Sequence, residues 1–321
     1  MIRCYMGVDV GSVSTNIVLI NEEGDLLKKI YLRTRGQPIA TIQDGFKELS
    51  DVLANEVEIL GVGTTGSGRH LAGVIVGADV VKNEITAHAV AASYAEPNVQ
   101  TVIEIGGQDS KIIILRNGIA VDFAMNTVCA AGTGSFLDQQ AARLGIPIEE
   151  FGNLALKATA PVRIAGRCTV FAESDMVHKQ QMGHRPEDIV AGLAQALVRN
   201  YLNNVGKGKE ILPTVVFQGG VAANQGIKVA FEEALGFPVI VPRNFAVMGA
   251  IGAALLAKEE VKKDGRKTKF KGLEVANFEY RASSFECDGC SNCCEIIEIM
   301  KDDVVVARWG GRCPKWEMKA S

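Results

Sequence analysis

Apolar positions along this chain fall into two patterns, short β-branched runs typical of strands and periodic stretches typical of helices. In the first half, Ile42, Phe46 and Leu49 recur at helical spacing and predict an amphipathic helix. Glu84 and His88 stand one helical turn apart, where a solvated pair is expected. The pattern predicts strands at 2–10, 14–21, 27–33 and 59–64 and helices at 39–56 and 84–94.

The second half repeats this order in outline. An apolar run ends at an acidic residue, a Gly106-Gly107 turn follows, and a second strand leads to Asn117-Gly118, a type I′ hairpin signal. Such a duplication is typical of a two-lobed nucleotide-binding fold with a cleft between the lobes. The expected elements are strands at 101–106, 111–116, 119–124, 215–217 and 239–241 and a small-residue helix at 246–257.

Changes in composition predict the domain boundaries. Residues 1–95 form the first predicted lobe, which the helix at 245–258 completes, and residues 96–244 form the second. The basic, polar stretch 259–272 is read as a linker. Residues 273–321 are rich in cysteine and are expected to form a small separate metal-binding module.

Composition also limits the classes of function. The 321 residues are 47% hydrophobic with a net charge of −3, which gives no sign of a nucleic-acid partner. The N-terminus lacks a basic region followed by an apolar core, and no apolar run reaches the ~18 residues of a membrane span. A soluble cytoplasmic protein is therefore expected. Its eight cysteines are better explained as metal ligands or free thiols than as disulfides.

Three glycine-containing loops follow predicted strands and are suited to phosphate binding, because glycine lets backbone N–H groups approach an anion. The chain has no Walker A motif. Asp9 would hold Mg²⁺ through water, and Glu104 and Gln108 are candidates for positioning metal or the attacking water. The candidate nucleotide-binding residues are Gly11, Ser12, Val13, Ser14 and Thr15 in the first loop, Gly106, Gly107 and Asp109 in the second, and Gly219, Gly220 and Val221 beside the adenosine.

Cys129 and Cys168 each precede a predicted helix. A helix N-terminus carries partial positive charge, which favours a thiolate and a bound anion. Two such thiolates cannot complete a four-thiolate iron–sulfur site, but two chains related by a two-fold axis can. Taken singly, each cysteine is better explained as a small buried hydrophobic residue, and only the two together favour metal ligation.

Five motifs together resemble the BadF/BadG/BcrA/BcrD family, and within it the activators of 2-hydroxyacyl-CoA dehydratases and the reductases of double-cubane-cluster proteins. The resemblance covers residues 3 to about 258. The motifs are GTTGSGR at 63–69, NEITAHA at 83–89, IGGQDSK at 105–111, the stretch 126–135 and GGVA at 219–222.

This resemblance implies an α/β fold of two duplicated RNase H-like lobes, as in the acetate kinase, sugar kinase, Hsp70 and actin superfamily. It implies ATP with Mg²⁺, and a homodimer whose Cys129 and Cys168 share one [4Fe–4S] cluster. The activity it implies is ATP-driven one-electron transfer, from reduced ferredoxin or flavodoxin to a dehydratase-like or double-cubane-cluster enzyme. A small-molecule kinase, such as an amino-sugar kinase, and an ATP-dependent switch without electron transfer are the alternatives.

Two positions depart from the family pattern. Glu104 stands where dehydratase activators usually have Asp, and Ala223 where many have Lys. Both departures leave the ATPase prediction intact and make a standard dehydratase a less secure choice of partner.

The cysteine-rich tail contains a C-x₂-C knuckle, followed by a predicted hairpin at 296–308 that would return Cys313 to the knuckle. Five cysteines compete for four ligand places. The cysteine pattern of longer relatives of the family implies that the four ligands are Cys287, Cys290, Cys294 and Cys313. A metal site is favoured, either zinc that staples the tail or a second iron–sulfur cluster that relays electrons, and a compact module of free thiols is the remaining alternative.

Overall fold

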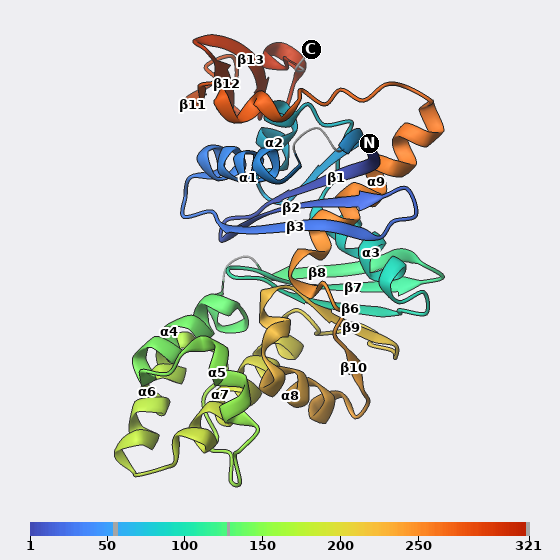
Figure 1. The fold of residues 1–321 in the computed structure, drawn as a ribbon. Coiled ribbons are helices and arrows are strands. Elements are labelled where there is room, and N and C mark those ends of the chain that lie inside the picture. The colour runs from blue at the N-terminus through green and yellow to red at the C-terminus, as the bar shows by residue number, and fades with distance from the viewer. Residues whose placement is uncertain (54–56, 127–128, 319–321) are drawn as a thin grey trace. The chain divides into compact units, whose positions relative to one another are not determined.

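The computed structural model describes residues 1–53, 57–126 and 129–318 (Figure 1). Contacts divide the chain into two compact units. Unit 1 comprises Met1–Ala87 and the chain from Gly249 onward, and unit 2 comprises His88–Met248. Within the described ranges, no helix has both the length and the apolar character that a membrane crossing requires.

Unit 1 is built on a five-stranded sheet in the order β3-β2-β1-β4-β5. The first three strands are antiparallel, and β4 and β5 continue parallel to β1. The four predicted strands are confirmed, whereas α2 and the short β5 were not predicted. The elements are β1 (Ile2–Val10), β2 (Ser14–Asn21), β3 (Leu26–Arg33), α1 (Pro38–Leu53), β4 (Val57–Thr65), α2 (Arg69–Val76), β5 (Val80–Val81) and most of α9 (Met248–Asp264).

Unit 2 repeats this topology with the order β10-β9-β6-β7-β8. Asn117 and Gly118 both have positive φ, 53° and 75°, as the predicted type I′ turn between β7 and β8 requires. The strands are β6 (Thr101–Ile105), β7 (Ser110–Arg116), β8 (Ile119–Asn126), β9 (Val215–Gln218) and β10 (Val239–Ile240). The helices are α4 (Gly134–Leu144), α5 (Ile148–Ala155), α6 (Thr169–Gln181), α7 (Pro186–Asn204) and α8 (Gln225–Leu235), with α3 (Glu84–Ala95) crossing the unit boundary.

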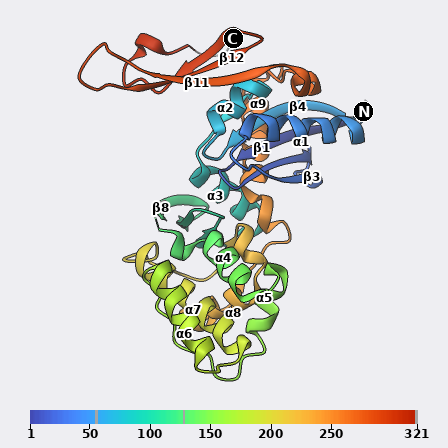
Figure 2. The ribbon, with the colours of Figure 1, turned by 90° about the vertical axis from the view of Figure 1, so that its left-hand side faces the viewer.

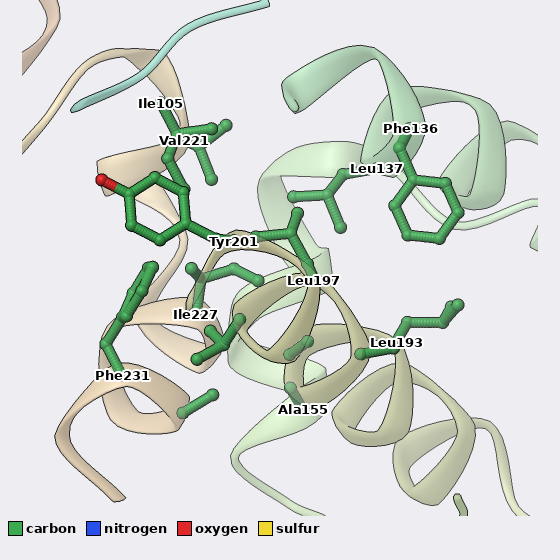
Figure 3. Packing of buried hydrophobic residues seen from close by; sticks show 14 of the residues in the cluster. Ile105, Phe136, Leu137, Ala155, Leu193, Leu197, Tyr201, Val221, Ile227 and Phe231 are labelled. Carbon is green, nitrogen blue, oxygen red and sulfur yellow. The ribbon is translucent and has the colours of Figure 1, made fainter. Parts of the chain in front are cut away.

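Helix α7 runs through the hydrophobic core of unit 2 (Figure 3). Leu193 and Leu197 face α4 and α5, while the Tyr201 ring meets Phe231 edge-on at a centroid distance of 5.3 Å. The Tyr201 hydroxyl donates to the Lys111 carbonyl at 2.7 Å. This bond satisfies a polar group inside the core and fastens α7 to β7.

The tail forms a three-stranded antiparallel sheet, β11 (Tyr280–Glu286), β12 (Glu295–Lys301) and β13 (Val304–Trp309), which includes the predicted hairpin. Val275, Ala276, Tyr280 and Ile299 belong to the same hydrophobic cluster as the core of unit 1. Figures 1 and 2 both show the tail next to α2. Where the sequence predicted a separate module after a linker from residue 259, α9 runs to Asp264 and the tail belongs to unit 1.

One side chain of α1 anchors the segment that leads into the tail. The Gln43 amide nitrogen lies 2.7 Å from the Phe278 carbonyl, 3.2 Å from that of Ala276 and 3.4 Å from that of Val275. These carbonyls belong to the 3₁₀ turn Leu273–Asn277 and the residue after it. Apolar burial and this polar anchor together explain why the tail packs on unit 1.

Candidate nucleotide loops and thiol loops

The first candidate phosphate loop connects β1 and β2 in unit 1. The Gly11 N–H donates to the Ser14 carbonyl at 2.9 Å and closes the turn. The Thr34 hydroxyl donates to the Gly11 carbonyl at 2.9 Å and lies 3.0 Å from the Thr15 hydroxyl. Thr34 was not predicted, because it directly follows β3 and lies 19 positions from Thr15. Ser12 remains exposed at the tip of the turn, where a ligand can reach it.

Asp9 lies near the end of β1, opposite Asn16 on one side and Thr65 on the other. A Cβ on Gly66 would stand 2.6 Å from the Asp9 Oδ1 atom, and the φ of Gly66 is +93°. Glycine is therefore required at Gly66 for the backbone to pass so close to the carboxylate. Asp9 and the first loop belong to unit 1, and the other two candidate loops belong to unit 2.

The second candidate loop, in unit 2, contains a buried ion-pair network. Lys111 Nζ lies 3.0 Å from Glu104 Oε2 and 2.9 Å from Asp109 Oδ2. Burial raises the pKa of Glu104, and the ammonium of Lys111 acts in the opposite direction. Lys111 was missed as a site residue, because a lysine within an apolar strand has no distinctive spacing. Gln108 is exposed beside this network.

The third candidate loop follows β9, which is paired with β6 so that Gln218 lies opposite Glu104. Gly219 has a φ of +90°, and a Cβ there would stand 2.6 Å from Glu104 Oε1 and would overlap the Ile105 carbonyl. The second and third loops are therefore in close contact. His88 is buried, not solvated as expected, and its Nδ1 lies 2.8 Å from Gln218 Nε2.

Helix α4 begins directly on the second candidate loop. The Gly134 N–H donates to the Gly106 carbonyl at 2.9 Å, and the Ser135 N–H donates to the Gly107 carbonyl at 2.8 Å. The Ser135 hydroxyl reaches the Gly107 carbonyl as well, at 2.6 Å. The first turn of α4 is thus fastened to a loop predicted to hold phosphate.

Cys129 lies just before that helix and is half-buried. It caps the 3₁₀ helix η1 (Ala130–Gly132), so α4 itself begins five positions after the thiol. The Asn126 side chain accepts from the Cys129 N–H at 3.0 Å and donates to the Cys129 carbonyl at 2.7 Å. Residues 127–128 of the quoted motif lie outside the described residues.

Cys168 is the N-cap residue of α6, so this predicted helix start is confirmed. Three side chains hold the preceding loop. Asp175 accepts from the Ala165 N–H at 2.9 Å, Arg199 donates to the Ile164 carbonyl at 2.8 Å, and Asn200 donates to the Gly166 carbonyl at 2.5 Å. Both thiols belong to unit 2.

In the tail, the segments around Cys287 and Cys313 lie side by side. The Cys287 N–H donates to the Cys294 carbonyl at 2.8 Å, which extends the β11–β12 ladder. The Cys287 sulfur accepts from the Gly289 N–H at 3.4 Å and from Trp316 Nε1 at 3.2 Å, and these bonds lower its pKa. Over the parts of the chain that the structure describes, no three His, Cys, Asp or Glu side chains are gathered as a metal site.

Comparison with known proteins places these features in a family. The model of the BadF/BadG/BcrA/BcrD ATPase family matches residues 6–257. The (R)-2-hydroxyglutaryl-CoA dehydratase activating ATPase of Acidaminococcus fermentans is 36% identical over 267 residues, which are 80% of this chain and 98% of that protein. The family match ends before the cysteine-rich tail begins.

Solved structures agree on the fold. The activator of the 2-hydroxyisocaproyl-CoA dehydratase from Clostridium difficile, with bound ADPNP, has a TM-score of 0.74 at 33% identity. The match covers 82% of this chain and 97% of the activator chain. A ROK family glucokinase from Streptomyces griseus, at 14% identity, has a TM-score of 0.50 over 80% of this chain and 99% of its own. The predicted two-lobed fold of the sugar-kinase type is confirmed.

Proposed function

Because this chain belongs to the BadF/BadG/BcrA/BcrD ATPase family, we propose that it hydrolyses ATP to drive low-potential, one-electron transfer to a partner iron–sulfur enzyme. The partner would be a 2-hydroxyacyl-CoA dehydratase-like or double-cubane-cluster protein, and ferredoxin or flavodoxin would supply the electron. The observation that carries the proposal is the attachment of α4, the helix after Cys129, to the Gly106–Gly107 loop.

The nucleotide would be bound as Mg-ATP by the three glycine loops. Asp9 would hold the metal through water, and Glu104 and Gln108 would position metal or water. Lys111 already neutralises part of the charge of Glu104 and Asp109, so it limits repulsion between these carboxylates and the phosphates. Catalysis in such sites comes mainly from positioning and charge stabilisation.

The two thiols fit a shared [4Fe–4S] cluster in number and in surroundings. One chain supplies Cys129 and Cys168, half of the four thiolates that such a cluster needs, so the cluster requires a homodimer. Each thiol belongs to the residue before a helical turn, where free N–H groups favour negative charge. When bound, the cluster would supply the one-electron redox step.

The tail cysteines support a second, smaller proposal. Cys287, Cys290, Cys294 and Cys313 would bind zinc or a second iron–sulfur cluster. The knuckle and the Cys313 segment are neighbours, since Arg312 reaches Asn292 at 3.4 Å and Trp316 reaches Cys287 at 3.2 Å. Binding a metal would have to draw these thiols together.

The test is anaerobic purification followed by measurement of iron, sulfide and zinc per chain. We expect roughly two irons per chain, one four-iron cluster per dimer, and their loss in Cys129→Ser and Cys168→Ser but not in Cys4→Ser. Cys4 is a matched control because it is fully buried in β1, remote in sequence, and has a pKa raised to about 11 by burial. Zinc in addition would make the tail structural, and roughly six irons per chain would place a second cluster there.

The same preparations distinguish the alternatives. Absence of iron after strict anaerobic reconstitution would overturn the electron-transfer proposal, and stoichiometric phosphorylation of an amino sugar by iron-free protein would establish a kinase. Iron-loaded protein that binds ATP and a partner, yet passes no electron from dithionite, would establish a switch.

A further inference from the structure

Helix α7 supports the Cys168 loop directly. A Cβ on Gly166 would stand 2.8 Å from the Ala196 carbonyl, so the loop lies against the helix backbone at this point. Consecutive residues of α7, Arg199 and Asn200, donate to the carbonyls of Ile164 and Gly166. The path of the chain two residues before Cys168 is therefore set by α7.

The other end of the same Asn200 side chain faces the Cys129 loop. A Cβ on Gly132, three residues after Cys129, would stand 3.0 Å from Asn200 Oδ1 and 3.6 Å from Asn126 Nδ2. Because Asn200 Nδ2 donates to Gly166, its oxygen must face Gly132. One amide thus lies between the two thiol loops, with its nitrogen on one and its oxygen on the other.

The position of the Asn200 amide lowers the stability of the fold. Asn200 is 3% exposed, and among the residues that the structure describes its buried Oδ1 atom has no hydrogen-bond partner. An unpaired buried acceptor is destabilising, and an apolar residue of similar size would avoid the cost. The neighbouring α7 residues Leu197, Val198 and Tyr201 are all buried hydrophobic residues. A polar group kept at such a position needs a role beyond packing.

We propose that Asn200 is a positioning residue that sets the spacing of Cys129 and Cys168 within one chain. The inference rests on the proposed function, in which both thiols ligate the same cluster. Metal–thiolate distances tolerate deviations of only about 0.2 Å, so two loops that move independently would hold the cluster poorly. Residues behind the ligands typically change metal affinity by about 10–100-fold when mutated.

The test compares Asn200→Leu, which keeps the size but removes the hydrogen bond to Gly166 and the amide oxygen that faces Gly132, with Asn203→Leu at an exposed position of the same helix. Full-length protein is reconstituted anaerobically, and iron release to bathophenanthroline is followed together with the EPR spectrum of the reduced form. We expect Asn200→Leu to release iron at least about tenfold faster, with an altered spectrum and unchanged ATP affinity. Asn203→Leu should match the wild type.

A second variant approaches the contact from the other loop. Gly132→Ala places a methyl group against Asn200 Oδ1, and it should reproduce the faster iron release even if Asn200→Leu fails to fold. Wild-type release rates and spectra in both Asn200→Leu and Gly132→Ala would overturn the inference, as would parallel losses of ATP affinity and melting temperature, which indicate general destabilisation. Wild-type protein without iron would instead overturn the proposed function itself.

Discussion

The buried pair of Lys111 and Glu104 yields a quantitative prediction about stability. Their side chains are 3% and 5% exposed, and their charged atoms are 3.0 Å apart. Lys111→Met removes the ammonium and leaves the carboxyl group buried without its partner. Breaking a buried ion pair in this way costs about 3–5 kcal/mol of the free energy of unfolding, a large part of the roughly 5–15 kcal/mol typical of a native protein.

The pH dependence of this loss follows from the pKa of Glu104. Burial already raises that pKa, and without Lys111 it rises further. Below the pKa of the unfolded state both states bind the proton, so the carboxyl group has no effect on the pH slope. Above it the unfolded state ionises while the folded state keeps its proton, and the free energy of unfolding falls by up to about 1.4 kcal/mol per pH unit until the folded pKa is passed. The wild type follows the same slope only up to its own, lower folded pKa, so the deficit of Lys111→Met grows with pH above the pKa that Glu104 has in the wild type.

Urea titrations followed by far-UV circular dichroism at pH 5 and pH 8 measure this deficit. The double variant Lys111→Met/Glu104→Gln is the control, because a neutral amide needs no counter-charge; it should recover most of the stability and lose the pH dependence. Asp109, whose side chain is 32% exposed, remains solvated and contributes little. Equal deficits at the two pH values, or no recovery in the double variant, would refute the electrostatic reasoning.

Three further predictions concern the loops and the tail. Gly219→Ala should weaken ATP binding by about tenfold or more in calorimetry, because its φ of +90° and the nearby Ile105 carbonyl strain any side chain there by about 1–3 kcal/mol; unchanged affinity would exclude a nucleotide role for this turn. Thr34→Val removes the hydrogen bond from the Thr34 hydroxyl to the Gly11 carbonyl, so it should lower the free energy of unfolding by about 0.5–1.5 kcal/mol and raise the KM for ATP. A lower melting temperature with an unchanged KM would show that Thr34 is purely structural. Gln43→Leu should speed tryptic cleavage between α9 and β11 several-fold by removing the tail's polar anchor, and wild-type digestion would show that apolar contacts suffice.

The strands and their turns could be predicted because their signals are local. The β-branched runs of β1, β2 and β7 and the Asn117-Gly118 turn specify backbone conformation within a few residues. The start of α6 at Cys168 was likewise readable from neighbouring residues. Duplication of the strand–turn–strand order then indicated two sheets of the same topology.

The contacts that complete the candidate site could not be predicted in the same way, because they join distant parts of the chain. Thr34 reaches Gly11, Asn200 reaches Gly166 and Tyr201 reaches Lys111 across 23, 34 and 90 positions. No propensity or spacing marks such partners, since each residue is ordinary in its own element. The contact between the tail segment and α1 is equally long-range: Gln43 lies 235 positions from the Phe278 carbonyl to which it donates.

These long-range contacts make unit 2 a continuous structure between the second candidate loop, Gly106–Gly107, and the loops of Cys129 and Cys168. Gly106 and Gly107 accept the first hydrogen bonds of α4, whose preceding turn contains Cys129. On the other route, Lys111 forms an ion pair with Asp109 of the same loop, and its carbonyl accepts the hydrogen bond of the Tyr201 hydroxyl on α7. The adjacent α7 residue, Asn200, donates to the carbonyl of Gly166 in the loop of Cys168. A displacement of the Gly106–Gly107 loop must therefore either move these elements together or break buried hydrogen bonds, each worth about 0.5–1.5 kcal/mol. If nucleotide and cluster bind as proposed, these two routes from one loop to both thiols would let ATP binding act physically on the cluster.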